Sequence, residues 1–524
     1  MAQPPHVSQQ APQQAPPQPP AHPPLSGVPL VLATISLSLA TFMNVLDTTI
    51  ANVALTPIAG DLGVSPSQGT WIITSFAVSS AISVPLTGWL TQRLGALRLF
   101  LMSTFLFTVA SVLCGLSQSL NMLVAARVLQ GMVSGPMIPL CQALLLQCYP
   151  KEKAGLALAF WGMTATIAPV MGPILGGWLT DNWSWPWIFY INIPVGLISI
   201  WLTAAMLRGR ETPTRRVSVD YVGLLLLVIW VGATQIMLDR GKELDWFNSV
   251  DVIILAVVAV IGFTFFLIWE LTEEHPIVDL SLFAQRNFAA GCLALTLGYS
   301  TFFGTLVLIP MWLQRTMGYT ATWAGLVTAP IGILALILSP ILGRMMGTVD
   351  PRWFATISFI VMALCNFWRA TFSPDVDALT IANTHLWQGI AMATFFIPLT
   401  AIILSGLEPH RIPSASGLFN FLRLMAAAFA ASLWTTGWEN GATRHHAYLT
   451  EHVTVASTET TQVLDNAQAL GLSPEQALAL VNARIITPQA QLLSILDMFW
   501  LAGGLFVILI AAIWLSRPAR APRR

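Results

Sequence analysis

The sequence predicts an all-helical protein that crosses a membrane many times, and three observations lead to this fold class. Of the 524 residues, 55% are hydrophobic and only 9% are charged, whereas charged residues make up about 25% of an ordinary soluble protein. Apolar stretches long enough to cross roughly 30 Å of hydrocarbon recur about fourteen times. These stretches lack the alternation of barrel strands, and lipid offers no hydrogen-bond partner to open backbone, so each is expected to be a helix.

The elements follow an N-terminal tail. Residues 1–28 are rich in Pro and Gln, contain no apolar core of a cleavable signal peptide, and are expected to be disordered. Residues 517–524 form a short basic tail after the last span. The predicted spans are 29–52, 70–90, 99–118, 122–147, 155–179, 188–207, 219–238, 250–269, 288–312, 323–345, 352–371, 385–405, 416–437 and 494–516.

The distribution of basic residues predicts the orientation of these spans. If the N-terminus is cytoplasmic, sixteen Arg and Lys residues lie in inner loops and tails and five lie in outer loops. This is the positive-inside bias of a membrane protein, and an even number of spans then places both termini in the cytoplasm. The equal numbers of basic and acidic residues, 24 of each, exclude a broadly cationic nucleic-acid binder.

One expected outer loop, 438–493, is much longer than the others. Within it, Ser473, Pro474 and Gln476 form the pattern of a helix start, with an N-cap, a first-turn proline and a reciprocal cap. The segment is interpreted either as a docking surface for a partner outside the membrane or as a loop packed on its own helix ends. The apolar side chains expected on one face of this helix are Ala477, Leu478, Leu480, Val481 and Ile485.

The cysteine and histidine patterns predict neither a disulfide framework nor a metal site. The five cysteines lie in or at the ends of apolar runs without a CxxC or Cys/His pattern, so they are expected to be reduced core residues. His445 and His446 lie in the long outer loop without evident carboxylate partners. Solvated side chains are expected there rather than a metal site.

Two ionisable residues inside apolar spans mark a candidate functional position, because such groups are expensive to place in lipid. Asp47 lies in the first span, and Arg127 lies about five residues, or roughly 8 Å, into a span entered from the outer side. The two side chains are therefore expected at a similar depth. Desolvation favours the protonated carboxyl and a nearby Arg favours the ionised one, a competition that suits reversible protonation. The alternative is a buried ion pair that only fixes helix packing.

Three further ionisable residues, Arg369, Arg423 and Asp497, lie within a turn or two of predicted span ends. Long or polar side chains at such positions reach the membrane interface. We therefore expect these three to extend toward the interface rather than to point into the bundle.

The fifth predicted span carries a run of small residues and prolines. Gly172, Gly176 and Gly177 allow a neighbouring helix to approach closely, while Pro169 and Pro173 bend the helix. Close packing is expected of this span, and a hinge or seal between two halves is the further hypothesis.

Several motifs resemble those of the fourteen-helix drug:proton antiporter branch of the major facilitator superfamily. LDTTIANVAL (46–55) resembles its first-helix motif and has Asp47 at the acidic position. RVLQGMVSGPMIPL (127–140) resembles the fourth-helix motif with Arg127 and Gln130, and GPILGG (172–177) resembles the fifth-helix motif.

The resemblance extends to the loops and covers residues 30–516. GWLTQRLGALRLF (88–100) resembles the loop motif after the second helix, although Gln92 stands where that motif has Asp. QIMLDRGKELDWF (235–247) and GYTATWAG (318–325) resemble the inner-membrane pumps of tripartite multidrug efflux systems. The residues that the loop motif carries over are Gly88, Arg93, Gly95 and Arg98.

The resemblance implies a major facilitator fold with two six-helix halves. These halves are residues 29–207 and 288–516, and residues 208–287 supply two additional helices and their loops. Substrate is then expected near the membrane midplane, with alternating access by rocking of the halves. Polar residues on the spans are candidates for substrate binding, with ordinary interhelical hydrogen bonds as the alternative: Asn44, Thr48, Gln130, Gln235, Asn366, His385 and Gln388.

The function implied is export of hydrophobic or amphipathic toxic compounds by proton antiport across a bacterial inner membrane, with Asp47 and Arg127 as the coupling residues. A periplasmic adaptor protein and an outer-membrane channel are the implied partners, and the proton motive force replaces any cofactor. An alternative is a transporter for one specific metabolite that is not coupled through Asp47. A membrane enzyme or receptor is disfavoured because the sequence has no HExxH, GxSxG or P-loop motif.

Overall fold

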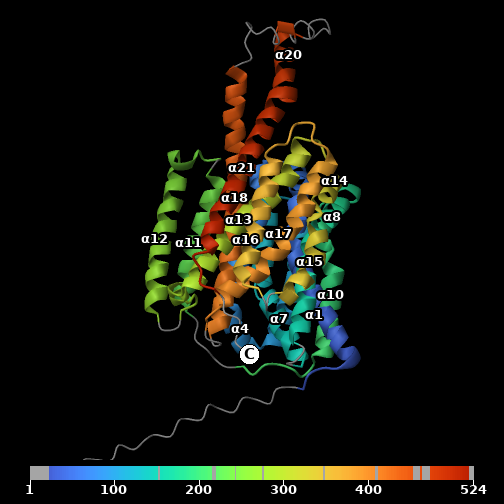
Figure 1. Ribbon diagram of the computed structural model, residues 1–524, viewed down its shortest axis with the longest axis vertical. Coiled ribbons are helices and arrows are strands. Elements are labelled where there is room, and N and C mark those ends of the chain that lie inside the picture. Colours follow the sequence, from blue (N-terminus) through green and yellow to red (C-terminus); the bar gives the residue numbers. More distant parts are fainter. Residues whose placement is uncertain are drawn as a thin grey trace, which may run out of the picture.

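The computed structural model describes residues 23–150, 154–214, 220–241, 243–273, 276–345, 349–407, 411–451, 461–462 and 473–518. Across these ranges the regular structure is entirely helical, and the long helices run side by side along one axis of the molecule (Figure 1). Eleven helices, or twelve with one bent pair, are long and apolar enough to cross a membrane. The protein is therefore a multi-pass membrane protein, and most of both tails lies outside the described residues.

The first six predicted spans all coincide with helices. The second span is broken, because the helix ending at Ser83 and the helix starting at Thr87 meet at 59°. The helices are α1 (Gly27–Asp61), α2 (Pro66–Gly69), α3 (Trp71–Ser83), α4 (Thr87–Leu94), α5 (Ala96–Gly115), α6 (Leu120–Ser134), α7 (Met137–Cys148), α8 (Ala154–Asn182), α9 (Trp187–Tyr190) and α10 (Asn192–Met206).

The remaining eight spans also coincide with helices. The two additional helices are α11 (Tyr221–Arg240) and α12 (Val250–Thr272), with the short turns η2 (Trp246–Asn248) and η3 (Leu280–Ala284) beside them. The second half contains α13 (Arg286–Arg315), α14 (Ala321–Thr328), α15 (Ile331–Met345), α16 (Pro351–Arg369), α17 (Ala378–Leu404), α18 (Ile412–Glu451), α20 (Pro474–Val481), η5 (Asn482–Ile486) and α21 (Thr487–Ile513).

A local repeat relates the first helices of the two halves. Gly63 after α1 and Gly318 after α13 both have positive φ, a conformation that glycine adopts without strain. Two residues later, Ser65 and Thr320 each cap the next helix by accepting a backbone hydrogen bond. The same turn therefore closes the first helix of each half.

The two halves pack together through α1, α3, α13 and α18. Helix α1 lies against α8, α10 and α13, and α3 lies between α6 and α18. One hydrophobic cluster joins Leu46 and Ile50 of the first half to Val307 and Trp434 of the second. Helix α11 contacts both α3 and α18, whereas α12 packs mainly on α11 and leaves large apolar side chains such as Val260 and Phe265 exposed.

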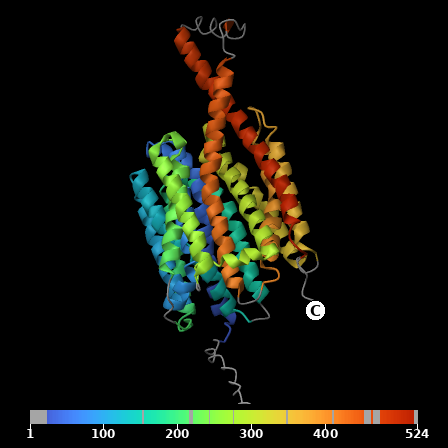
Figure 2. The ribbon, with the colours of Figure 1, turned by 90° about the vertical axis from the view of Figure 1, so that its left-hand side faces the viewer.

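The segment 438–493, expected as a loop, is largely helical where it is described. Helix α18 continues to Glu451, and α20, η5 and the start of α21 return beside it. These two helical segments project beyond the bundle (Figures 1 and 2). The predicted capping box of Ser473 and Gln476 is confirmed. The bundle end where both described termini lie is called the inner end, and the projection marks the outer end.

This projection also corrects the expectation for His445. Its Nε2 lies 2.7 Å from Oδ2 of Asp497, so a carboxylate partner exists on the returning helix. His446 likewise contacts Asn482 Oδ1 at 2.6 Å. In the described residues no group of three metal-binding side chains forms, and the five cysteines are free and buried as expected.

Candidate functional site

The candidate site is built around a carboxylate in the middle of α1. This helix continues through Pro57 to Asp61, so Asp47 sits well inside it and is fully buried. Arg127 follows the first residue of α6 by seven positions, about 10 Å along the helix. Its Nη1 donates a hydrogen bond to Asp47 Oδ2 within an ion pair that is at most 1% exposed. The expectation that both residues share one depth is confirmed.

The second oxygen of Asp47 accepts hydrogen bonds from two amides. Gln130 Nε2 and Asn192 Nδ2 each lie 3.0 Å from Oδ1. Both amides also donate to Ser111 Oγ, at 2.8 and 3.2 Å. Four helices, α1, α5, α6 and α10, therefore supply one closed polar network in the first half.

Arg127 is held from several sides. Its Nε donates to the carbonyl oxygen of Ile72 at 2.9 Å, and its Nη1 also donates to Gln130 Oε1 at 2.7 Å. The guanidinium carbon lies 4.2 Å from the ring centre of Phe76 and 5.5 Å from that of Phe189. These aromatic faces attract the cation and keep it away from lipid.

The network suits an ionised carboxylate, because every bond to Asp47 comes from a donor. Binding a proton to the carboxyl removes the ionic attraction to Arg127 and weakens the bonds that the oxygens accept. The guanidinium would then need another partner, since leaving one member of a buried ion pair alone costs about 3–5 kcal/mol. The bonds of Asp47 therefore connect α1 to both α6 and α10.

Two predicted substrate residues near Asp47 have structural hydrogen bonds. Asn44 Nδ2 donates to the carbonyl oxygen of Ser134 at 3.0 Å, which joins α1 to α6. Thr48 Oγ1 donates to the carbonyl oxygen of Val45 in its own helix. Of the seven predicted substrate residues, Gln130 is the one that bonds directly to Asp47.

A separate polar cluster links α16 and α17 through Arg369 and the predicted residue Gln388, and two further predicted residues, Asn366 and His385, lie on the same helices. Arg369 donates to Gln388 Oε1 at 2.6 Å and to Thr384 Oγ1 at 3.0 Å. His385 Nδ1 lies 3.0 Å from the carbonyl oxygen of Ile381. Asn366 donates to its own helix and is also fully buried.

This cluster corrects the expectation for Arg369. The side chain is 0% exposed and does not extend to the interface, because Gln388 and Thr384 receive its donors inside the bundle. In the sequence, HLWQG (385–389) shares its last two residues, Gln and Gly, with RVLQG (127–131), and His385 then stands at the position of Arg127. That local similarity was a signal in the sequence for a second polar cluster, placed on α17 where Arg127 and Gln130 lie on α6.

Arg423 also differs from its expectation. It lies eleven residues into α18, about 16 Å from the helix start. Its guanidinium carbon sits 5.5 Å from the ring centre of Tyr299 and 5.7 Å from that of Phe396. The two rings hold this cation inside the bundle, whereas Asp497 is exposed as expected.

The fifth-helix motif packs α8 against both halves. A side-chain carbon on Gly172 would lie 2.2 Å from Thr49 Oγ1 of α1, and one on Gly176 would lie 2.7 Å from the Ile50 carbonyl oxygen. One on Gly177 would lie 2.4 Å from the carbonyl oxygen of Ala321 in α14. Pro173 lies at this contact, since its carbonyl oxygen would be 2.1 Å from a carbon added to Gly325. Backbone approach of this kind requires glycine.

The loop motif runs into the start of α5. Glu211 also lies there, although no pattern in the sequence indicated it. Its carboxylate accepts hydrogen bonds from the backbone nitrogens of Leu97 and Arg98 at 3.0 and 2.9 Å. Gly95 has φ +90°, and a side-chain carbon there would lie 2.3 Å from this carboxylate. An acidic group at a helix N-terminus is stabilising, so Glu211 stabilises the start of α5.

Two other members of the loop motif have modest contacts. Arg93 lies over the ring of Trp89 with its guanidinium carbon 5.2 Å from the ring centre. A side-chain carbon on Gly88 would meet nothing within 4 Å.

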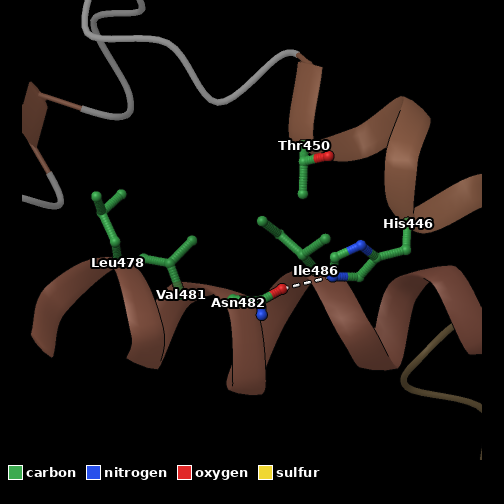
Figure 3. A pocket seen from close by; sticks show the side chains of 6 residues that line it. All are labelled: His446, Thr450, Leu478, Val481, Asn482 and Ile486. Atoms are coloured by element: carbon green, nitrogen blue, oxygen red, sulfur yellow. Dashed lines mark hydrogen bonds between the residues drawn. The ribbon is translucent and has the colours of Figure 1, made fainter. Parts of the chain in front are cut away.

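A separate pocket of about 240 Å³ lies on the outer projection, away from Asp47. It is lined by α18 and the returning helix, and Figure 3 shows His446 reaching across to Asn482. Of the apolar residues predicted for the face after Ser473, Leu478 and Val481 line it. The other lining residues are Thr450 and Ile486.

Comparison with known proteins identifies the family of this chain. The family model of the Major Facilitator Superfamily matches residues 37–431. The multidrug export protein EmrB of Escherichia coli (strain K12) is 53% identical over 495 residues, which are 94% of this chain and 96% of that protein. The fatty acid resistance protein FarB of Neisseria gonorrhoeae is 47% identical over 494 residues, covering 94% and 97%.

Solved structures show the same fold at low sequence identity. A bacterial homolog of the human lysosomal transporter Spinster matches with a TM-score of 0.58 and 14% identity, over 95% of this chain and 100% of that one. A peptide transporter in complex with sulfate matches with a TM-score of 0.61 and 11% identity, over 94% and 97%.

Proposed function

The chain belongs to the Major Facilitator Superfamily, and we propose that it is a multidrug efflux transporter that exports hydrophobic or amphipathic toxic compounds in exchange for protons. High identity to multidrug export proteins along nearly the whole chain supports the drug substrates. The observation that carries proton exchange is the fully buried Asp47–Arg127 pair.

Proton exchange follows from the geometry of this network. Asp47 as an ion accepts bonds from Arg127, Gln130 and Asn192, and protonation weakens all three. Those donors come from α6 and α10, so loss of the bonds loosens α1 from its neighbours. A proton arriving from the outer side would thus accompany drug release, and its departure to the inner side would restore the pair.

Alternating access is supported by the way the halves meet. Close backbone contacts between α8 and α14 join the halves at their outer ends. Because only glycine permits these contacts, the helices can close tightly and part again. We therefore assign α8 the role of an outer seal, with Gly177 and Gly325 at its contact surface.

The cellular setting is part of the same proposal. We place both termini in the cytoplasm of a bacterial cell, on the basis of the basic residues of the inner loops and tails. A periplasmic adaptor protein, and through it an outer-membrane channel, would receive the exported compounds. The helical projection of α18 and α21 supports this, because it extends from the outer end of the bundle toward such a partner (Figure 2).

The proposal is tested by efflux from vesicles that contain the purified transporter. A panel of hydrophobic drugs is followed under a defined pH gradient, with and without the adaptor protein. We expect several chemically different drugs to be exported faster when the gradient is imposed. Transport of a single metabolite, independent of the gradient, would support the alternative of a specific transporter.

A further inference from the structure

A second carboxylate, Asp239, lies where the additional helix α11 meets both halves of the protein. Thr74 Oγ1 of α3 donates to its Oδ2 at 2.9 Å. Gln235 Nε2, one turn earlier in α11, donates to Oδ1 at 2.7 Å. Ser432 Oγ of α18 also donates to Oδ1. One carboxylate therefore accepts hydrogen bonds from three helices.

The hydrogen bonds of Asp239 connect the two halves of the protein. Thr74 belongs to the first half and Ser432 to the second, so the carboxylate bridges the halves through opposite oxygens. Asp239 is the second-last residue of α11, and Thr74 is near the start of α3, so the bridge lies toward the outer end. Trp71 adds a bond from its Nε1 to the Asp239 carbonyl oxygen at 3.3 Å.

Among the described residues, the carboxylate of Asp239 forms no ion pair. Helix α3 carries no titratable side chain. Arg240 lies over the ring of Trp71, with its guanidinium carbon 6.0 Å from the ring centre, and Glu243 follows in the next turn of chain.

The titratable groups of α18 with described partners face other helices. Arg423 lies over rings of α13 and α17, Glu439 pairs with Arg315, and His445 contacts Asp497. The Asp239 bridge therefore consists of hydrogen bonds to neutral donors.

We propose that Asp239 is a second proton-binding group of the transporter, which holds the outer ends of the halves together when ionised and releases them when protonated. A carboxylate forms charge-assisted hydrogen bonds that are roughly twice as strong as those of a neutral carboxyl. A proton from the outer side therefore weakens the bonds to Thr74 and Ser432. The proposal rests on the exchange function argued above and adds an outer latch to it.

The test measures the distance between the outer ends of the halves. Spin labels are attached to Ser184→Cys in the first half and Ser373→Cys in the second, both exposed and both in the outer loops that follow α8 and α16. The five native cysteines are buried, which favours labelling of the introduced ones. The full-length protein in lipid is measured by pulsed electron paramagnetic resonance between pH 5 and pH 8.

We expect the outer-open fraction to rise as the pH falls in the wild-type background. Asp239→Asn should be mostly open at both pH values, because loss of one charge-assisted bond shifts the equilibrium about tenfold. Thr74→Val and Ser432→Ala should each increase the open fraction at pH 8. Asp239→Glu keeps the carboxylate and should retain the pH dependence.

A wild-type pH dependence in Asp239→Asn would overturn the latch. The Asp47→Asn variant separates the two proposals, because it keeps the Asp239 bridge. If it loses proton-coupled export but still opens with falling pH, both proposals stand. If Asp239→Asn behaves as wild type while Asp47→Asn loses coupling, the latch fails and the exchange function survives.

Discussion

Asp47 and Arg127, eighty residues apart in the chain, form an ion pair that the surrounding helices exclude almost completely from solvent. The pair joins α1 to α6, and two amides from α6 and α10 hold the second carboxylate oxygen. A charge pair at this depth is expensive unless each partner is fully satisfied. The network meets that condition for the ionised carboxylate and not for the protonated one.

Replacing Asp47 by Asn should abolish proton-coupled export. The amide keeps the shape of the side chain but cannot exchange a proton, and it leaves Arg127 without its counter-charge. Drug efflux under a pH gradient should fall to the rate measured without a gradient, because an ionisable group inside the membrane marks the functional site. Asp61→Asn is the matched control, since Asp61 ends the same helix and accepts a bond from Trp185. Equal loss in both variants would contradict the special role of Asp47.

Replacing Arg127 by Gln should lower the free energy of unfolding of the protein. It leaves the buried Asp47 unpaired, for which about 3–5 kcal/mol is expected. The apparent unfolding temperature in detergent measures this. The double variant Asp47→Asn with Arg127→Gln should regain much of the stability, because no buried charge remains. If the double variant is less stable than Arg127→Gln alone, the pair is not the source of the loss.

Adding a methyl group at Gly325 should keep the outer seal from closing. The added carbon would lie 2.1 Å from the carbonyl oxygen of Pro173, so α14 must move away from α8. Overpacking of this kind costs about 1–3 kcal/mol, which lowers the closed population roughly tenfold. Gly504→Ala is the control, because nothing lies within 4 Å of an added carbon there. Drug transport and the distance between spin labels at the outer ends of the halves are measured in both variants. Wild-type values of both in Gly325→Ala would contradict the seal.

Removing the carboxylate of Glu211 should weaken the start of α5. Glu211 accepts bonds from two backbone nitrogens there, and loss of a helix cap costs about 1 kcal/mol. Arg98→Ala should change stability little, because Arg98 is 74% exposed and its ion pair with Glu211 is 3.9 Å long. Thermal unfolding of both variants provides the comparison. A larger effect from Arg98→Ala would show that the ion pair matters more than the cap.

The contact between Asp279 and Arg411, on the inner side, should stabilise the fold only above acid pH. Partial burial alone would raise the pKa of Asp279, but hydrogen bonds from Ser281 and Arg411 outweigh it and lower that pKa below its usual value. A lowered pKa gives stability that is present above the unfolded value, about 3.9, and is lost as the pH falls through the folded value. The unfolding temperatures of wild type and Asp279→Asn should differ at pH 7 and converge below about pH 4. A constant difference would exclude this link.

The spans and the ion pair were predictable from sequence because lipid imposes strong rules. Long apolar runs must be helices, and isolated charges within them must find partners. Asp47 and Arg127 followed from these rules. Asn192 and Ser111 did not, because a polar residue near a span end has no signal that distinguishes it from an ordinary helix contact.

Other features depend on packing that no local pattern encodes. Arg369 was expected at the interface because it ends α16, but Gln388 and Thr384 on α17 hold it inside. The outer segment 438–493 was polar enough to suggest a loop, yet Trp438 and Ser494 join its two helices by hydrogen bonds. Glu211 lies in a loop far from α5 in sequence, so its cap was visible only in three dimensions.

The most direct test of the exchange mechanism is the movement of protons when drug leaves a vesicle. Liposomes that contain the purified transporter are loaded with an exported fluorescent drug and an internal pH dye, without an imposed gradient. We predict that the lumen of wild-type vesicles acidifies in proportion to the drug released, and that Asp47→Asn vesicles show no such acidification. Equal acidification in Asp47→Asn vesicles would contradict the assignment of proton exchange to this carboxylate.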